Sequence, residues 1–300
     1  MALNSYTERH MDRAAKVLGP ALAFGLSFLA WFSTSPSVAE DAPKASDNSI
    51  LRVCAAANEA PYSKQDESGF ENKIAKVLAE SMNRKVEFVW SPKAAIYAVR
   101  DQLDKNLCDI VIGLDTGDPR VLTSKPYYRA SYVFVIRKDS PLKVENFNSP
   151  DLAKAGKIGF VPGTPASVMM ETMDLYNDSI NYASSLTNFK DRRNAYTRIP
   201  PERMINEVSD KTAGLAVAFA PEVSRYVKAN DDLKMIVIPD NNVRSDGKKV
   251  PLHFDQSFGV RKDDNALLSA INEALPKVQS KIEDVLKDEG IPFVPPESKS

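Results

Sequence analysis

Two kinds of hydrophobic pattern alternate along the chain. Short β-branched apolar runs predict strands buried on both faces of a sheet, and apolar residues spaced three and four apart predict amphipathic helices. The order of the two in the first half, strand, helix, strand, helix, strand, predicts a parallel sheet covered by helices. Strands are predicted at 50–55, 86–90, 110–112, 131–137, 157–160, 214–219, 235–238 and 255–261, and helices from 70 onward and at 94–103, 166–175, 201–208, 221–227 and 265–288.

Two strands resemble each other and divide the chain. The run SYVFVIR at 131–137 ends one series of strands and helices, and DQSFGVR at 255–261 ends a second series. Two such units joined by two strands predict an α/β fold of two lobes, with a cleft at the crossings and closure by hinge motion. We assign 50–137 plus 256–300 to lobe 1 and 138–255 to lobe 2.

The N-terminal segment has the pattern of a secretory signal. Arg9, Arg13 and Lys16 precede an uncharged apolar run at 17–32, and Ser37-Val38-Ala39 places small residues where a signal peptidase requires them. We therefore expect 1–39 to be a signal peptide and 40–49 a disordered lead-in, with the mature protein in the periplasm. A membrane anchor is the alternative, but the apolar run is shorter than the roughly 20 residues that span a bilayer.

Composition restricts the classes of partner and cofactor. The 39 basic and 40 acidic residues nearly cancel, so no nucleic-acid-binding face is expected. Two cysteines and two histidines supply no metal-ligand cluster. Export would allow a disulfide between Cys54 and Cys108, although one lies late and the other early in its strand. The alternative is that both are small buried hydrophobic residues.

The strand at 110–112 leads into a candidate ligand site. Gly113 ends the strand, a polar turn follows, and Pro119 favours a helix start with Asp118 as its N-cap. Ligands of open α/β sheets bind beyond the carboxyl ends of the strands, so Arg120 is expected to face a cleft. A plain loop with a solvated arginine remains the alternative.

Several motifs together resemble the type 2 periplasmic solute-binding proteins, in particular the polar amino-acid receptors. These are LRVCAAANEAPYS, GFENKIAKVLAE, CDIVIGLDTGDPR, SKPYY, YVFVIRKDS, VPGTPA and AFAPEVSRYV, which stand in the order typical of that family within a resemblance that runs through roughly 51–286. The resemblance implies a two-lobed type 2 fold with two crossover strands as its hinge.

The resemblance also implies the residues of the ligand cleft. Arg120 matches the arginine that holds a ligand carboxylate, and Gly163-Thr164 matches the turn that offers backbone N–H groups. Asp115 and Gly117 replace the usual hydroxyl residues, and Phe219 replaces the acid that holds an ammonium group. We therefore expect ordinary amino acids to bind poorly, because a buried unpaired ammonium costs several kcal/mol. The candidate cleft residues are Asn58, Glu59, Tyr62, Phe70, Glu71, Asp115, Thr116, Arg120, Tyr127, Tyr128, Gly163, Thr164 and Phe219.

Three functions remain open at this point. Within the family, the strongest resemblance is to accessory proteins of methanol oxidation, which implies methanol dehydrogenase subunits as partners. It also implies no permanently bound cofactor, with pyrroloquinoline quinone (PQQ) as a ligand that the protein would handle. The fold alone would fit the binding component of an ABC transporter for a small solute. An enzyme on this scaffold is the third possibility. The sequence shows no Ser-His-Asp or Cys-His set, but a lone carboxylate such as Glu71 could still act in acid–base catalysis.

Overall fold

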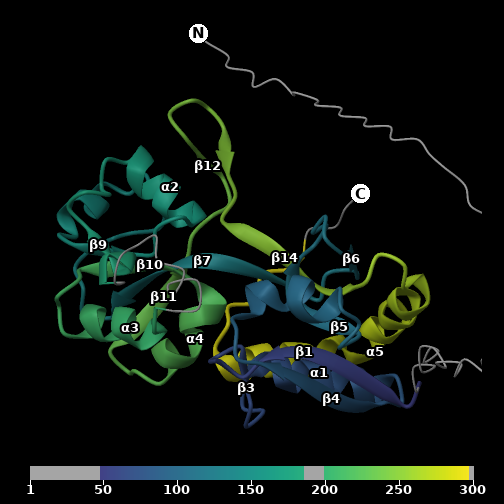
Figure 1. Ribbon diagram of the computed structural model, residues 1–300. Coiled ribbons are helices and arrows are strands. Elements are labelled where there is room, and N and C mark those ends of the chain that lie inside the picture. The colour runs from purple at the N-terminus through teal and green to yellow at the C-terminus, as the bar shows by residue number, and fades with distance from the viewer. Residues whose placement is uncertain (1–47, 186–198, 297–300) are drawn as a thin grey trace, which may run out of the picture. The chain divides into compact units, whose positions relative to one another are not determined.

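The computed structural model describes residues 48–185 and 199–296 (Figure 1). The predicted signal at 1–39 and most of the lead-in lie outside the described residues, as does the segment 186–198. Lobe 1 has the predicted parallel arrangement, in which β1 (Ile50–Ala56) pairs with β4 (Lys85–Ser91) and β5 (Ile110–Asp115). Helices α1 (Phe70–Ser81) and α5 (Asn265–Glu289) pack together over this sheet and share its apolar core.

Lobe 2 is built on a second group of strands. β10 (Leu215–Phe219) is parallel to β8 (Ile158–Phe160), which in turn is parallel to the short β9 (Ile180–Asn181). Two apolar clusters, on opposite sides of this group, hold α2 (Pro165–Thr172) on one side and α3 (Pro201–Ser209) with α4 (Ala220–Lys228) on the other.

Two long strands connect the lobes, as the sequence predicts. β7 (Tyr128–Arg137) pairs through 128–131 with β14 (His253–Val260), and through 132–137 with β10 and with β11 (Leu233–Val237). β14 continues into lobe 1, where it is antiparallel to β5. Ten of the described strands therefore form one sheet, in which the two crossover strands are neighbours, while β2 with β3 and β12 with β13 form two separate two-stranded sheets. The remaining short elements are β2 (Asn58–Glu59), β3 (Ser63–Lys64), η1 (Ala95–Tyr97), η2 (Val99–Leu103), β6 (Leu122–Thr123), η3 (Pro150–Lys154), η4 (Tyr182–Ser185), β12 (Asn242–Val243) and β13 (Lys249–Val250).

Three local predictions are wrong. The segment 94–103 is not an α-helix but a 3₁₀ turn, η1, followed by a π turn, η2, and this change of period turns Ile96 to solvent while Val99 and Leu103 stay buried. No helix begins at Pro119, because β6 pairs with β14 three residues later. The closing segment is one 25-residue helix that continues through Pro276.

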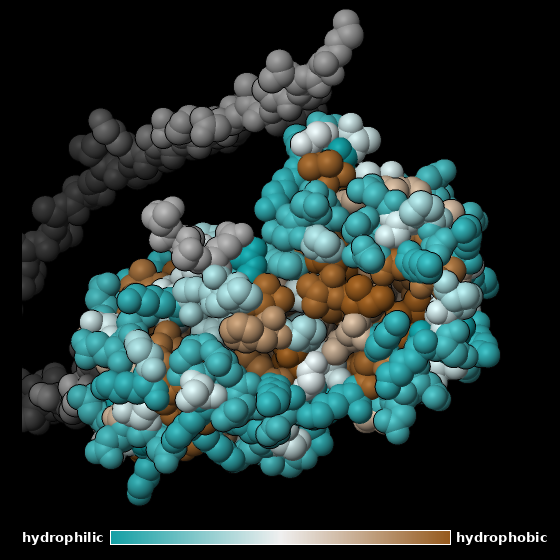
Figure 2. Space-filling model, turned by 180° about the vertical axis from the view of Figure 1, so that it is seen from behind, coloured by the Kyte–Doolittle hydropathy of each residue, from teal (hydrophilic) through white to brown (hydrophobic). Residues whose placement is uncertain are grey.

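A hairpin of β12 and β13 rises from the second connection between the lobes (Figure 1). It lies between β11 and β14 in the chain, where none of the strands or helices predicted from the sequence falls. From behind, the projection at the top of Figure 2 is largely hydrophilic and carries one apolar patch.

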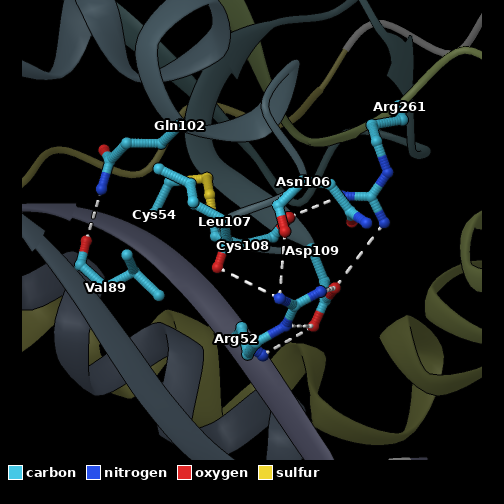
Figure 3. The surroundings of a disulfide bond; sticks show 9 residues. All are labelled: Arg52, Cys54, Val89, Gln102, Asn106, Leu107, Cys108, Asp109 and Arg261. Atoms are coloured by element: carbon cyan, nitrogen blue, oxygen red, sulfur yellow. Dashed lines mark hydrogen bonds and ion pairs between the residues drawn. A yellow bond between two sulfur atoms is a disulfide. The ribbon is translucent and has the colours of Figure 1, made fainter. Parts of the chain in front are cut away.

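The expected disulfide joins Cys54 and Cys108, with their Cα atoms 5.3 Å apart. Cys108 precedes β5 rather than lying inside it, so its chain can approach Cys54, which pairs with Val111 in the sheet. Two arginines hold the loop that carries Cys108 (Figure 3): Arg52 forms a bidentate pair with Asp109, and Arg261 donates to the carbonyl of Cys108. The cross-link and these bonds fix the entry to the strand that leads to the cleft.

Candidate functional site

A cleft of about 420 Å³ lies at the carboxyl end of β5, where the sequence places it. Lobe 1 supplies most of its wall and lobe 2 supplies Phe219 and Glu222. Six of the thirteen candidate residues line it: Glu59, Tyr62, Glu71, Asp115, Arg120 and Phe219.

Arg120 lies in this cleft but is already paired within its own turn. Its Nη2 donates to Oδ2 of Asp118 at 2.6 Å and its Nε to Oδ1 at 3.0 Å, while the backbone N–H of Arg120 also donates to Oδ1. The guanidinium bond holds the pKa of Asp118 below its usual value, and Asp118 raises the pKa of Arg120 in return. A bidentate pair of this kind occupies the Nε–Nη2 edge of the guanidinium, so a ligand carboxylate would have to displace Asp118 from that edge or bind through Nη1, which lies 3.5 Å from the carbonyl oxygen of Ile96.

Phe219 also lines the cleft, and its ring joins the two lobes. It packs against Tyr132 with ring centroids 5.2 Å apart and against Phe254 at 6.3 Å. It contacts the apolar cores of both lobes. The position at which the sequence resemblance implies an acid is therefore part of an apolar contact that a charge would disrupt.

Two carboxylates of the cleft wall are tied to neighbouring elements. Glu59 accepts from the backbone N–H of Ala95 at 2.6 Å and so holds the start of η1. Asp115 accepts from Gln256 at 2.7 Å and links the end of β5 to β14. Both bonds position the wall, so these acids serve the structure of the cleft whether or not a ligand binds.

Gly113 allows Glu71 to reach the cleft. Its φ is +72°, and a Cβ at this position would collide with the carboxylate of Glu71. Glu71 lies in the first turn of α1, where a negative charge complements the helix N-terminus. The strand therefore ends in glycine for both conformational and steric reasons.

The charges of the described lining exclude a polyanion. Five carboxylates, Glu59, Glu71, Asp115, Asp118 and Glu222, face one guanidinium, Arg120. PQQ carries three carboxyl groups, and like charges at close range repel strongly in a partly desolvated site. The residues of this cleft do not fit PQQ, and we assign it no role here.

The lobes are also held together beside the cleft. Arg225 on α4 donates to Glu289 at the end of α5, at 2.6 and 2.9 Å, and to the carbonyl of Ser68 at 3.0 Å. Lys73 on α1 adds a bond of 3.0 Å to Glu289. Burial opposes ionisation of Glu289, yet these cations lower its pKa. Because α4 carries Glu222 at its other end, this ion pair helps to set the width of the cleft.

The other seven candidates do not line the cleft. Phe70 and Tyr127 are fully buried in the lobe 1 core, with Tyr128 almost so, because they pack against neighbouring rings. Thr116 bonds to the β14 residues Asp255 and Ser257. The remaining three lie on β2 or at the start of α2: Asn58, Gly163 and Thr164.

Three further residues line the cleft that the sequence did not identify as cleft residues: Ile96, Asp118 and Glu222. A regular helix at 94–103 would place Ile96 on the same face as Val99 and Leu103, yet its side chain is 67% exposed at the cleft. Asp118 was expected to cap a helix. Glu222 was overlooked, although an acid in the first turn of a helix that follows a strand lies near that strand's carboxyl end.

The described residues hold no cluster of three or more metal-ligating side chains. Within the same residues, no helix has the length and hydrophobicity needed to cross a bilayer.

Comparison with known proteins establishes the family. Residues 51–283 match the model of the bacterial extracellular solute-binding proteins, family 3. The protein MoxJ of Methylorubrum extorquens AM1 is 49% identical over 250 residues, 83% of each chain, and MoxJ of Paracoccus denitrificans is 42% identical, over 84% of this chain and 92% of its own. A crystal structure of MxaJ from Methlophaga aminisulfidivorans MPT superposes with a TM-score of 0.77 at 48% identity, covering 81% of this chain and 100% of that one. The resemblance found in the sequence is thereby confirmed, and the chain belongs to family 3 of the bacterial extracellular solute-binding proteins, within which it groups with MoxJ and MxaJ.

Proposed function

We propose that this chain is a periplasmic accessory protein of methanol oxidation that contacts methanol dehydrogenase and assists assembly of the active enzyme. The link to methanol oxidation is supported by the 49% identity to MoxJ and the likeness to MxaJ. Periplasmic location is supported by the extracellular family and by the predicted signal at 1–39.

The pairing of Arg120 with Asp118 is the observation that favours an accessory protein over a receptor. A receptor for zwitterions needs a free guanidinium and an acid for the ammonium group, whereas here the guanidinium has a partner and Phe219 replaces the acid. The fold is thus retained while the binding chemistry of a receptor is altered, which favours a role through protein contacts. A catalytic role lacks support, since His253, the histidine of the predicted mature chain, bonds to the carbonyl of Ile238.

The alternative is the binding component of an ABC transporter for a small solute other than an ordinary amino acid. The cleft itself favours it, because 420 Å³ is enough for a small ligand. An excess of carboxylates in the wall would select a cationic solute.

Deletion of the gene separates the two functions. Under the accessory function, the deletion strain accumulates methanol dehydrogenase polypeptides that have little activity, and activity returns when the wild-type chain is expressed. Full dehydrogenase activity combined with loss of uptake of one solute would establish the transporter instead. Activity and polypeptide amounts are measured in the same periplasmic extract.

A further inference from the structure

The β12–β13 hairpin contributes no residue to the lining of the cleft. All seven residues from 243 to 249 are exposed, and they are bounded by the buried residues Asn242 and Val250. In Figure 1 the hairpin projects beyond the sheet, and the corresponding projection in Figure 2 is hydrophilic with one apolar patch. Within the hairpin Val243 is 54% exposed.

The hairpin is ordered at its base and its tip. The side chain of Asn242 donates to the carbonyl of Pro239, and Val250 packs in an apolar core of lobe 2. At the tip, Arg244 and Gly247 bond across the turn, with Gly247 in the left-handed region at φ +80°. Short hairpins are marginally stable alone. This one therefore presents its side chains on a base that the lobe holds in place.

The exposed residues carry net positive charge. Arg244, Lys248 and Lys249 stand against one acid, Asp246, which lies 3.2 Å from Arg244 and 3.6 Å from Lys248. Ion pairs this exposed contribute about 1 kcal/mol or less. Arg244 and Lys248 can therefore turn to a carboxylate on another protein at little cost. Asp246 alone cannot neutralise both of these cations.

The base of the hairpin is joined to the hinge between the lobes. Asp240 accepts from the backbone N–H groups of Leu252 and His253 on the β14 side, and from Lys249 at 3.1 Å. It also pairs with Arg129 of β7 at 3.4 Å, and Arg129 pairs in turn with Asp255 of β14. A partner on the hairpin would thus contact an element fixed to both crossover strands.

We propose that the β12–β13 hairpin is the docking element of this protein, and that its partner is an acidic protein face which receives Arg244 and Lys248 while Val243 packs against it. The inference rests on the proposed function, in which that partner is methanol dehydrogenase. The alternative is that the lysines only prevent the edges of the hairpin from pairing with strands of other chains.

Association of the mature protein with purified methanol dehydrogenase, measured by biolayer interferometry at several salt concentrations, tests the proposal. R244E/K248E is expected to weaken binding at least tenfold and to reduce its salt dependence, because two attractive contacts become repulsive. V243S is expected to weaken binding severalfold with its salt dependence unchanged. The matched control K154E/K281E makes the same charge change at lysines whose side chains are 70% and 58% exposed, and it should stay within about twofold of wild type.

The outcomes separate this inference from the proposed function. If wild type binds and the hairpin variants bind equally well, the hairpin is not the docking element and the accessory function stands. If the control loses as much affinity as R244E/K248E, only overall charge matters and the inference fails. If the wild-type protein does not bind the dehydrogenase, both the docking proposal and the proposed function are wrong. Far-ultraviolet circular dichroism and the melting temperature check that each variant is folded.

Discussion

At the scale of single residues, Asp118 determines whether the cleft offers the guanidinium of Arg120 to a ligand carboxylate. The position of Arg120 after β5 predicts a cleft arginine, and the structure places it in the cleft. Its partner was missed because Asp118 was assigned to a helix N-cap, whereas two residues of separation also suit a turn in which the acid holds the following arginine. Whether such an arginine is available to a ligand depends on three-dimensional geometry.

Asp118→Ala is expected to release Arg120 for an external carboxylate. Propionate suits the test because it carries a single carboxylate and has no ammonium group that would require the missing acid. By calorimetry the wild type should show no measurable binding, and the variant should bind propionate with Kd of about 1 mM, since a single charge-assisted bidentate contact supports weak affinity.

Asp151→Ala serves as the matched control for Asp118→Ala. It also removes one carboxylate, here from the ion pair with Lys154 in η3. It should behave like wild type. Equal propionate binding by the wild type and Asp118→Ala would mean that Asp118 does not occupy the arginine.

At the scale of elements, periodic segments were predictable and irregular ones were not. The strands and the helices from 70, 166, 201 and 221 follow the hydrophobic pattern because one face of each packs on a core. The π turn at Val99–Leu103 breaks the 3.6-residue period. A helix predicted from that period therefore places Ile96 on the buried face, whereas its side chain is exposed. The hairpin at 242–250 has no apolar pattern because seven of its residues face solvent.

Gly113→Ala is expected to destabilise the protein more than Gly117→Ala. Both glycines have positive φ, +72° and +86°, so each alanine costs about 1 kcal/mol of backbone strain. Only at 113 does the new methyl group also meet a neighbour, the carboxylate of Glu71, and nothing lies within 4 Å at 117.

Urea unfolding of the two glycine variants measures the difference. We expect a loss of about 1 kcal/mol for Gly117→Ala and about 2 to 3 kcal/mol for Gly113→Ala, because overpacking adds to the strain. Equal losses would show that Glu71 is free to move away, and that Gly113 is required only for its backbone conformation.

At the scale of the whole molecule, two lobes with two crossings could be predicted from two similar strands, and the structure has this fold. The contacts that hold the lobes together could not be predicted from the sequence. Arg225, Glu289 and Lys73 lie far apart in the chain, and each resembles an ordinary surface charge. The packing of α4 and of α1 against α5 brings them together. The boundaries 50–137 plus 256–300 and 138–255 remain a prediction.

Glu289→Gln is expected to destabilise the protein at neutral pH by about 2 kcal/mol. This is less than the loss for a fully buried pair, since Arg225 and Lys73 partly reach solvent. The folded-state pKa of Glu289 is lowered from 4.5, so the contribution is complete above pH 4.5 and disappears as the pH falls through the lower folded value.

Unfolding of wild type and Glu289→Gln between pH 3 and 8 tests this sign. The difference between their free energies of unfolding should be constant at neutral pH and shrink in the acid range. Glu80→Gln, which breaks the exposed pair with Lys281, should cost under about 1 kcal/mol at every pH. A loss for Glu289→Gln that grows as the pH falls would contradict the assigned ion pair.

The central claim is that this receptor fold no longer recognises amino acids, because Arg120 is paired with Asp118 and Phe219 replaces the acid. Isothermal titration calorimetry of the mature protein against each of the twenty amino acids tests it most directly. We predict that none binds more tightly than about 1 mM. Micromolar binding of any one of them would contradict the claim and return the protein to the receptors.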